Sequence, residues 1–83
     1  MTTSQQQQHL ADHFAHCIQV FGGTTAASRR LGIDERAIRR FINQERPLSA
    51  RLLRDTAKAL HLLAQEAAAA SSEAETLAST AEA

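Results

Sequence analysis

Five arginines lie within twenty residues, from Thr24 to Asn43, in the stretch TTAASRRLGIDERAIRRFIN. A guanidinium group pairs bidentately with O6 and N7 of guanine, and it also binds phosphate oxygens. All nine Lys and Arg residues of the chain lie between Arg29 and Lys58 with only four acidic residues, so this window has a net charge of +5. The zero net charge of the whole chain hides this asymmetry, which indicates a polyanionic partner. The alternative is a solvated helical face with interspersed ion pairs.

The elements around these arginines are predicted to form an all-α fold, a small bundle of four to five helices. Glycine and proline are scarce, whereas alanine and leucine, which favour helices, are common. A first helix is expected over residues 9–21, where Gly22 and Gly23 end it in a left-handed C-cap. One apolar stripe along this helix predicts its buried face. The stripe consists of Leu10, Phe14, Cys17, Ile18 and Phe21.

Two short helices, over residues 24–31 and 34–43, are predicted to form a helix-turn-helix. Gly32 lies between them and permits the positive φ that a tight turn often needs. Thr24 or Thr25 is expected to cap the first helix and Asp34 the second. A fourth helix, capped by Ser49, is expected to follow. The predicted organisation is a flexible N-terminus over 1–8, a DNA-binding and dimerisation domain over 9–70, and an acidic flexible tail over 71–83.

The apolar spacing of the second short helix turns its arginines outward, and such a helix fits the DNA major groove, which is about 12 Å wide. Residues near the start of a recognition helix usually meet base edges. The expected base contacts are Glu35, Arg36, Arg39, Arg40 and Asn43. Groups at the start of the preceding helix, and arginines after the recognition helix, are expected to bind phosphate. These are Thr24, Thr25, Arg46 and Arg51.

The last helix carries more apolar surface than one packing seam needs. Monomeric proteins seldom expose a large apolar patch, so a homodimer is expected; the alternative is that the first helix covers the whole surface. The expected dimer interface is formed by Leu52, Ala59, Leu62 and Leu63. A two-fold dimer would place its recognition helices about 34 Å apart, which predicts a palindromic site in double-stranded DNA.

Residues 10–60 resemble the helix-turn-helix domains of phage Cro and repressor proteins, and also YdaS-like antitoxins and the small regulators associated with anti-CRISPR operons. The resemblance is carried by FGGTTAASRRLGIDERAIRRFINQERPLS. The matching features are a small residue in the first short helix, LG at the turn, the isoleucine and phenylalanine of the second helix, and the RPLS loop. Ser28 stands where alanine is usual, and Gln44 or Glu45 stands where many relatives have glycine.

The resemblance implies a sequence-specific transcriptional repressor that is usually dimeric and often regulates its own operon. Such an operon would belong to a phage or mobile element, an anti-CRISPR operon being one form. The second interpretation is an antitoxin-like interaction module that mainly neutralises a partner protein. The steepness of the salt dependence separates the two, because neutralising several phosphates makes DNA affinity fall sharply with salt.

Metal, redox and catalytic chemistry find little support. His9, His13 and His16 fall at i, i+4 and i+7 and could share a metal ion, but a polar helix face is the simpler interpretation, and no metal or cofactor is predicted. Cys17 lies on the apolar stripe, which indicates a core thiol. No Gly-rich phosphate loop occurs, and Asp55 and His61 have no nucleophile beside them, so no enzyme is predicted.

The remaining expectations concern location and ligands. The chain has no run of 18 apolar residues. Its first ten residues contain neither the basic nor the apolar region of a secretory signal. A cytoplasmic protein of a bacterial host cell is therefore expected, with no membrane association and no small-molecule ligand.

Overall fold

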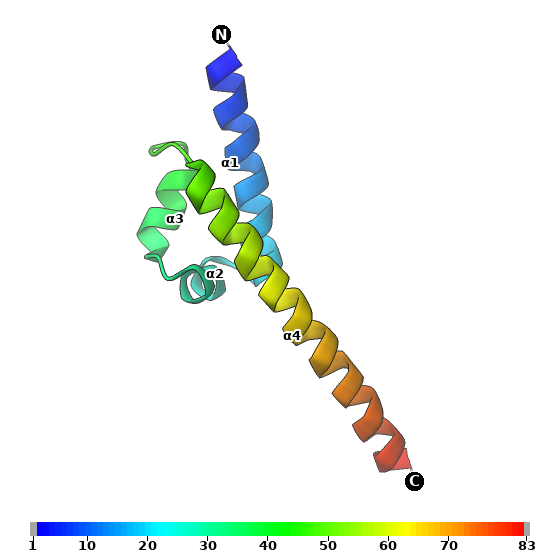
Figure 1. Ribbon diagram of the computed structural model, residues 1–83. Coiled ribbons are helices and arrows are strands. Elements are labelled where there is room, and N and C mark those ends of the chain that lie inside the picture. Colours follow the sequence, from blue (N-terminus) through cyan, green and yellow to red (C-terminus); the bar gives the residue numbers. More distant parts are fainter. Residues whose placement is uncertain (1, 83) are drawn as a thin grey trace.

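Four helices make up the computed structural model, which describes residues 2–82 and the side chains of residues 5–82. They are α1 (Thr2–Phe21), α2 (Thr24–Leu31), α3 (Glu35–Ile42) and α4 (Ala50–Glu82). Figure 1 shows α1 and α4 crossing, with α2 and α3 on one side of the crossing and the end of α4 extending away. No strand occurs in the described residues. The prediction of a small all-α bundle is confirmed.

The two outer helices are longer than the apolar pattern predicted. α1 begins at Thr2 instead of residue 9, and α4 continues to Glu82 through the segment expected to be a flexible tail. Neither segment contains glycine or proline, and glutamine, alanine and glutamate are good helix formers, so nothing local stops either helix. Residues 1 and 83 lie outside the described residues. The result is an elongated molecule of 62 × 23 × 17 Å.

Glycines end α1 and α2 as predicted. The Gly23 N–H donates to the Ile18 carbonyl at 2.9 Å and the Gly22 N–H to Gln19 at 3.0 Å, which is the hydrogen-bond pattern of a Schellman motif. Gly32 follows α2 in the left-handed conformation, with φ +69°, and its N–H donates to the Ser28 carbonyl. Three residues, 32–34, therefore suffice to connect α2 to α3.

The caps of the short helices differ in part from the prediction. Gly23, rather than a threonine, occupies the N-cap of α2, and α2 begins at Thr24. Asp34 is the N-cap of α3, but its side chain makes no capping hydrogen bond. The Ser28 hydroxyl instead ties the connection together by donating to the Ile33 carbonyl at 2.6 Å. At α4 the expected cap is present, because Ser49 Oγ accepts the N–H of Leu52 at 3.0 Å.

The core lies where α1, α2 and α3 pack together and where α1 and α2 meet α4. Phe14, Ile38 and Thr56 are its largest fully buried side chains. The ring of Phe14 meets Phe41 edge to face at 5.9 Å between centroids, an arrangement that adds to the burial of apolar area. The Thr56 hydroxyl donates to the Leu52 carbonyl, so its burial leaves no unpaired group. The buried apolar cluster is Ala11, Phe14, Ile18, Phe21, Ala27, Ile38 and Leu48.

Gln44 ends α3 in a conformation that glycine favours. The Glu45 N–H donates to Arg40 and the Gln44 N–H to Phe41, which again forms a Schellman motif, and Gln44 has φ +63°. A non-glycine residue costs about 1–2 kcal/mol in this region, partly offset by the greater chain entropy of glycine. We expect Gln44→Gly to raise the free energy of unfolding by about 0.5–1 kcal/mol.

Chemical denaturation of the Gln44→Gly variant measures this effect. The matched control is Glu45→Gly, because Glu45 does not have a positive φ. We expect that control to lower stability or leave it unchanged. A loss of stability in Gln44→Gly would show that the exposed hydrogen bond from Gln44 to Gln8, 2.8 Å long, outweighs the backbone strain.

Candidate nucleic-acid interface

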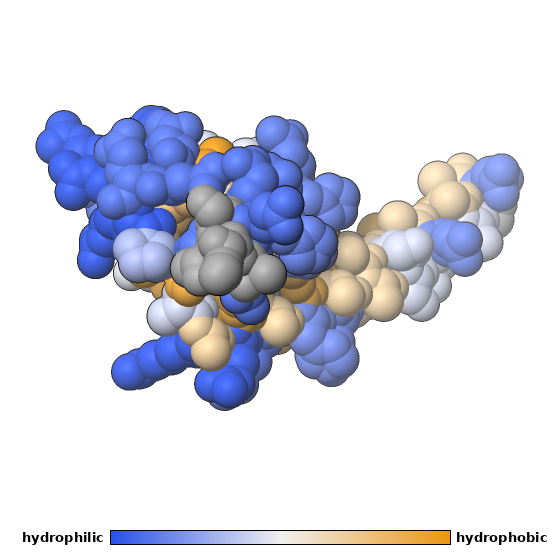
Figure 2. All heavy atoms as spheres, turned by 90° about the horizontal axis from the view of Figure 1, so that it is seen from above, coloured by the Kyte–Doolittle hydropathy of each residue, from blue (hydrophilic) through white to orange (hydrophobic). Residues whose placement is uncertain are grey.

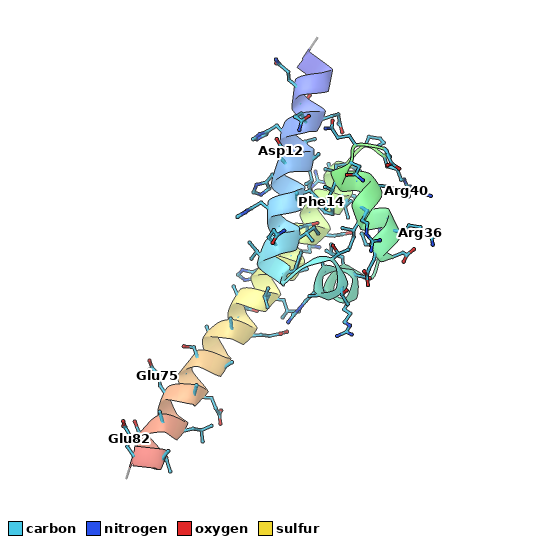
Figure 3. All side chains as sticks on the ribbon, turned by 180° about the vertical axis from the view of Figure 1, so that it is seen from behind. Asp12, Phe14, Arg36, Arg40, Glu75 and Glu82 are labelled. Carbon is cyan, nitrogen blue, oxygen red and sulfur yellow. The ribbon has the colours of Figure 1, made fainter. Side chains whose placement is uncertain are left out.

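One face of α3 is buried and the other carries arginines. Ile38 is fully buried, and Ala37, Phe41 and Ile42 are half-buried beside it. The side chains of Arg36, Arg39 and Arg40 are exposed. Figure 3 shows Arg36 and Arg40 on the side of α3 that faces away from α1, with Phe14 between the helices. The packing of α3 therefore presents three predicted base-contacting side chains together on an open surface.

Glu35 and Arg39 form a weak ion pair on this surface. The Arg39 guanidinium lies 3.5 Å from Glu35 Oε1, one helical turn away. Both side chains are more than one-third exposed, and exposed pairs of this kind contribute little to stability. Arg39 can therefore exchange this contact for another partner at little cost.

The loop after α3 and the first turn of α4 also carry exposed polar and charged side chains. Asn43, Arg46 and Arg51 are all exposed. The guanidinium of Arg46 lies over the ring of Phe41, 5.3 Å from its centroid, where a cation–π attraction holds it. Leu48 anchors the loop because its side chain is buried in the core. Of the predicted phosphate contacts, Arg46 is thus held in place by an aromatic ring, whereas Arg51 extends from the first turn of α4.

Thr24 and Thr25 lie at the N-terminus of α2, at the opposite end of that helix from its connection to α3. Thr24 is half-buried and Thr25 is exposed. Because Gly23 supplies no side-chain cap, no N-cap side chain competes for the first N–H groups of α2, and these groups and the exposed Thr25 hydroxyl can donate to an anion. The predicted phosphate contacts therefore come from the start of α2 and from the segment after α3.

An ion pair joins the last turn of α2 to the middle of α4. The Arg30 guanidinium donates to Glu66 Oε1 at 2.6 Å, although the two residues are 36 positions apart. The hydrogen bond from Arg30 lowers the pKa of the Glu66 carboxyl, and the same bond raises the pKa of Arg30. No local sequence signal predicted this contact, because it depends on how α4 crosses α2.

The Arg30–Glu66 pair predicts a pH-dependent stability difference. Since the pKa of Glu66 is lower in the folded state, its contribution is complete above the ordinary glutamate pKa of about 4.3 and is lost as pH falls through the lowered folded value. Arg30 stays charged throughout this range. We therefore expect Glu66→Gln to lower the melting temperature slightly at neutral pH and low salt, and the difference from wild type to vanish in acid.

Thermal unfolding at a series of pH values checks this. Glu45→Gln is the matched control, because Glu45 is exposed, lies outside α4 and forms no ion pair among the described residues. A Glu66→Gln penalty that stayed constant down to the lowest pH would contradict the assignment.

The predicted dimer-interface residues do not form one free surface. Leu52, Ala59 and Leu63 are half-buried and pack against the core of their own chain. Only Leu62, 51% exposed, lies open. Much of the apparent surplus on α4 is therefore used inside the bundle, because α1 and α2 both pack along its first half. These three side chains are only half-buried, so both the four-residue interface and the homodimer stay predictions.

The histidines of α1 and Cys17 form no metal site among the described residues. The rings of His13 and His16 have centroids 6.0 Å apart, and no group of three or more potential metal ligands comes together in the described part of the chain. Cys17 is buried, and burial raises the pKa of its thiol. Among residues 2–82, no helix combines the length and apolar character needed to cross a membrane.

Comparison with known proteins adds no relative. No protein-family model, curated protein or solved structure matches this chain. The functional argument therefore depends on the residues and geometry described above.

Proposed function

We propose that this chain is a sequence-specific DNA-binding protein that inserts α3 into the major groove and represses transcription. The observation that carries the proposal is the presentation of Arg36, Arg39 and Arg40 on one open face of a helix whose opposite face, at Ile38, is buried. Arg36 and Arg40 are one helical turn apart, and like charges at that spacing repel each other, so this pair does not stabilise α3 by itself.

The surroundings of α3 support the proposal. Backbone N–H groups and Thr25 at the start of α2, and Arg46 and Arg51 after α3, lie on the elements that flank the recognition helix and would hold it in register on phosphates. The resemblance to phage Cro and repressor proteins adds dimeric binding to a palindromic operator, with autoregulation of the chain's own operon. Repression would follow from steric exclusion of polymerase.

Fluorescence anisotropy with the DNA upstream of the gene, compared with a shuffled duplex, tests the proposal at two salt concentrations. We expect tight binding to the native fragment alone. A protein that contacts 6–10 phosphates loses about 10³–10⁵ in affinity between about 50 and 200 mM salt. Equal weak binding to both duplexes would contradict specific recognition, and no binding at low salt would leave the protein-neutralising module as the better interpretation.

A further inference from the structure

The second half of α4 extends beyond the bundle. The side chains of α4 that pack on the core end at Leu63, and every residue from 67 to 82 is exposed. In Figure 1 this half runs from yellow to red, away from α1, α2 and α3. At 1.5 Å per residue it is about 24 Å long. A single unsupported helix of this length is marginally stable in water, so a partner surface would stabilise it.

One apolar stripe runs through both halves of α4. From Leu53 onward, small or apolar residues recur with alternating steps of three and four, which is the spacing of coiled-coil seams. The stripe consists of Leu53, Thr56, Leu60, Leu63, Ala67, Ala70, Ala74, Leu77 and Ala81. Its first four members are buried or half-buried and its last five are exposed. The face that packs inside the bundle therefore continues, uncovered, along the projecting half, and Figure 2 shows tan and pale side chains there among blue ones.

An apolar groove of about 290 Å³ opens onto the same stripe. It lies between α1 and the first half of α4. Its α4 wall consists of Leu53, Thr56, Ala57 and Leu60, and its α1 wall of His9, Leu10, His13 and Cys17. The four α4 residues have the i, i+3, i+4, i+7 spacing of the hole that receives a single side chain in knobs-into-holes packing. Groove and projecting stripe thus form one continuous apolar surface.

We propose that a second copy of this chain covers this surface, with the two α4 helices antiparallel and the projecting half of each seated on the groove of the other. The inference specifies the interface of the dimer that the proposed function includes, and to that extent it rests on the proposed function. Leu77, 58% exposed, is the large apolar side chain of the projecting half. When Leu77 of one copy fills the groove of the other, the two-fold axis crosses α4 beside Glu66 and Ala67. That point is the middle of the Ala50–Glu82 helix, so the two helices overlap over nearly their full length.

Charge selects a second copy in this orientation. The first half of α4 carries three basic residues, Arg51, Arg54 and Lys58, against two acidic ones, Asp55 and Glu66, while the projecting half carries Glu73, Glu75 and Glu82 and no Lys or Arg. An antiparallel pair places each acidic half beside the basic half of the other copy, whereas a parallel pair would place acid beside acid. Small residues near the axis, including Ala64, Ala67 and Ala70, let the helices approach closely.

Analytical ultracentrifugation of the full chain without DNA tests the interface. We expect a dimer for the wild type and a rise of at least about 100-fold in its dissociation constant for Leu77→Glu, since each copy loses a buried leucine. The matched control is Leu62→Glu, because Leu62 is 51% exposed but lies off the stripe; it should leave the dimer intact. A monomeric wild type, or a dimer broken by Leu62→Glu and untouched by Leu77→Glu, would overturn the proposal.

Disulfide crosslinking tests the orientation. Mixing the Ala57→Cys and Leu77→Cys variants should give a disulfide between the two different chains, identified by mass spectrometry of the linked peptides. The Leu77→Cys variant alone is the control for Cys17, which also lines the groove. A disulfide formed readily by Leu77→Cys with itself would indicate parallel helices and overturn the antiparallel arrangement. A monomer that still binds the native DNA would refute only this inference, whereas a dimer that binds no DNA would refute only the proposed function.

Discussion

Replacing Phe14 with alanine is expected to lower the free energy of unfolding by about 3–5 kcal/mol. Phe14 has no exposed surface, and its ring packs edge to face on Phe41 of α3. The substitution removes buried apolar area and leaves a cavity at the point where α1 supports the arginine-bearing helix. A domain of this size has a total stability of about 4–12 kcal/mol, so the substitution removes at least about a quarter of it.

Urea unfolding followed by circular dichroism measures the Phe14→Ala effect. Protein concentration must be held constant, because dimerisation would add to the apparent stability. Val20→Ala is the control on the same helix: Val20 is 52% exposed, and its truncation should change stability by no more than about 0.5 kcal/mol. A loss below about 1 kcal/mol for Phe14→Ala would mean that the ring does not occupy the core.

Replacing Arg40 with alanine is expected to weaken binding to the specific DNA by about 1–3 kcal/mol, while binding to random DNA changes much less. Arg40 is exposed on the outer face of α3, and it forms no ion pair among the described residues. Its guanidinium is therefore free to make a bidentate contact with guanine. Because the side chain is exposed, we expect the melting temperature to remain that of the wild type.

Arg51→Ala is the informative comparison for Arg40→Ala. If Arg51 binds phosphate, its loss weakens binding to specific and random DNA equally and reduces the salt slope by about 1. Anisotropy titrations of both variants on both duplexes give the four affinities needed. Equal losses for Arg40→Ala on the two duplexes would reassign Arg40 to the backbone, and no loss on either would remove it from the interface.

Local signals were sufficient to predict the helices and much of their packing. Gly22, Gly23 and Gly32 end helices as predicted because their lack of a Cβ permits positive φ. Ser49 caps α4 through its hydroxyl. The stripe of Phe14, Cys17, Ile18 and Phe21 is buried because helical periodicity places those residues on one face. The start of α1 and the end of α4 were not predicted. These polar or alanine-rich segments contain no residue that stops a helix, so composition alone could not locate the two ends.

Contacts between segments distant in sequence required the tertiary structure. Leu48 follows a proline in a loop, yet its side chain is buried in the core; Arg30 reaches Glu66 across 36 positions. Leu52 and Leu63 belong to the apolar surplus that the sequence shows on α4, but they are half-buried and pack against the core of their own chain. The groove and the uncovered end of the α4 stripe likewise follow from where the helices cross.

The all-helical fold, the tight connection at Gly32 and the outward-facing arginines could therefore be predicted, because periodicity and backbone preference act over a few residues. Which apolar faces are buried inside the chain and which remain open depends instead on how the helices pack. Burial depends on the crossing of whole helices, and a crossing is set by the sum of many weak contacts between residues far apart in the chain.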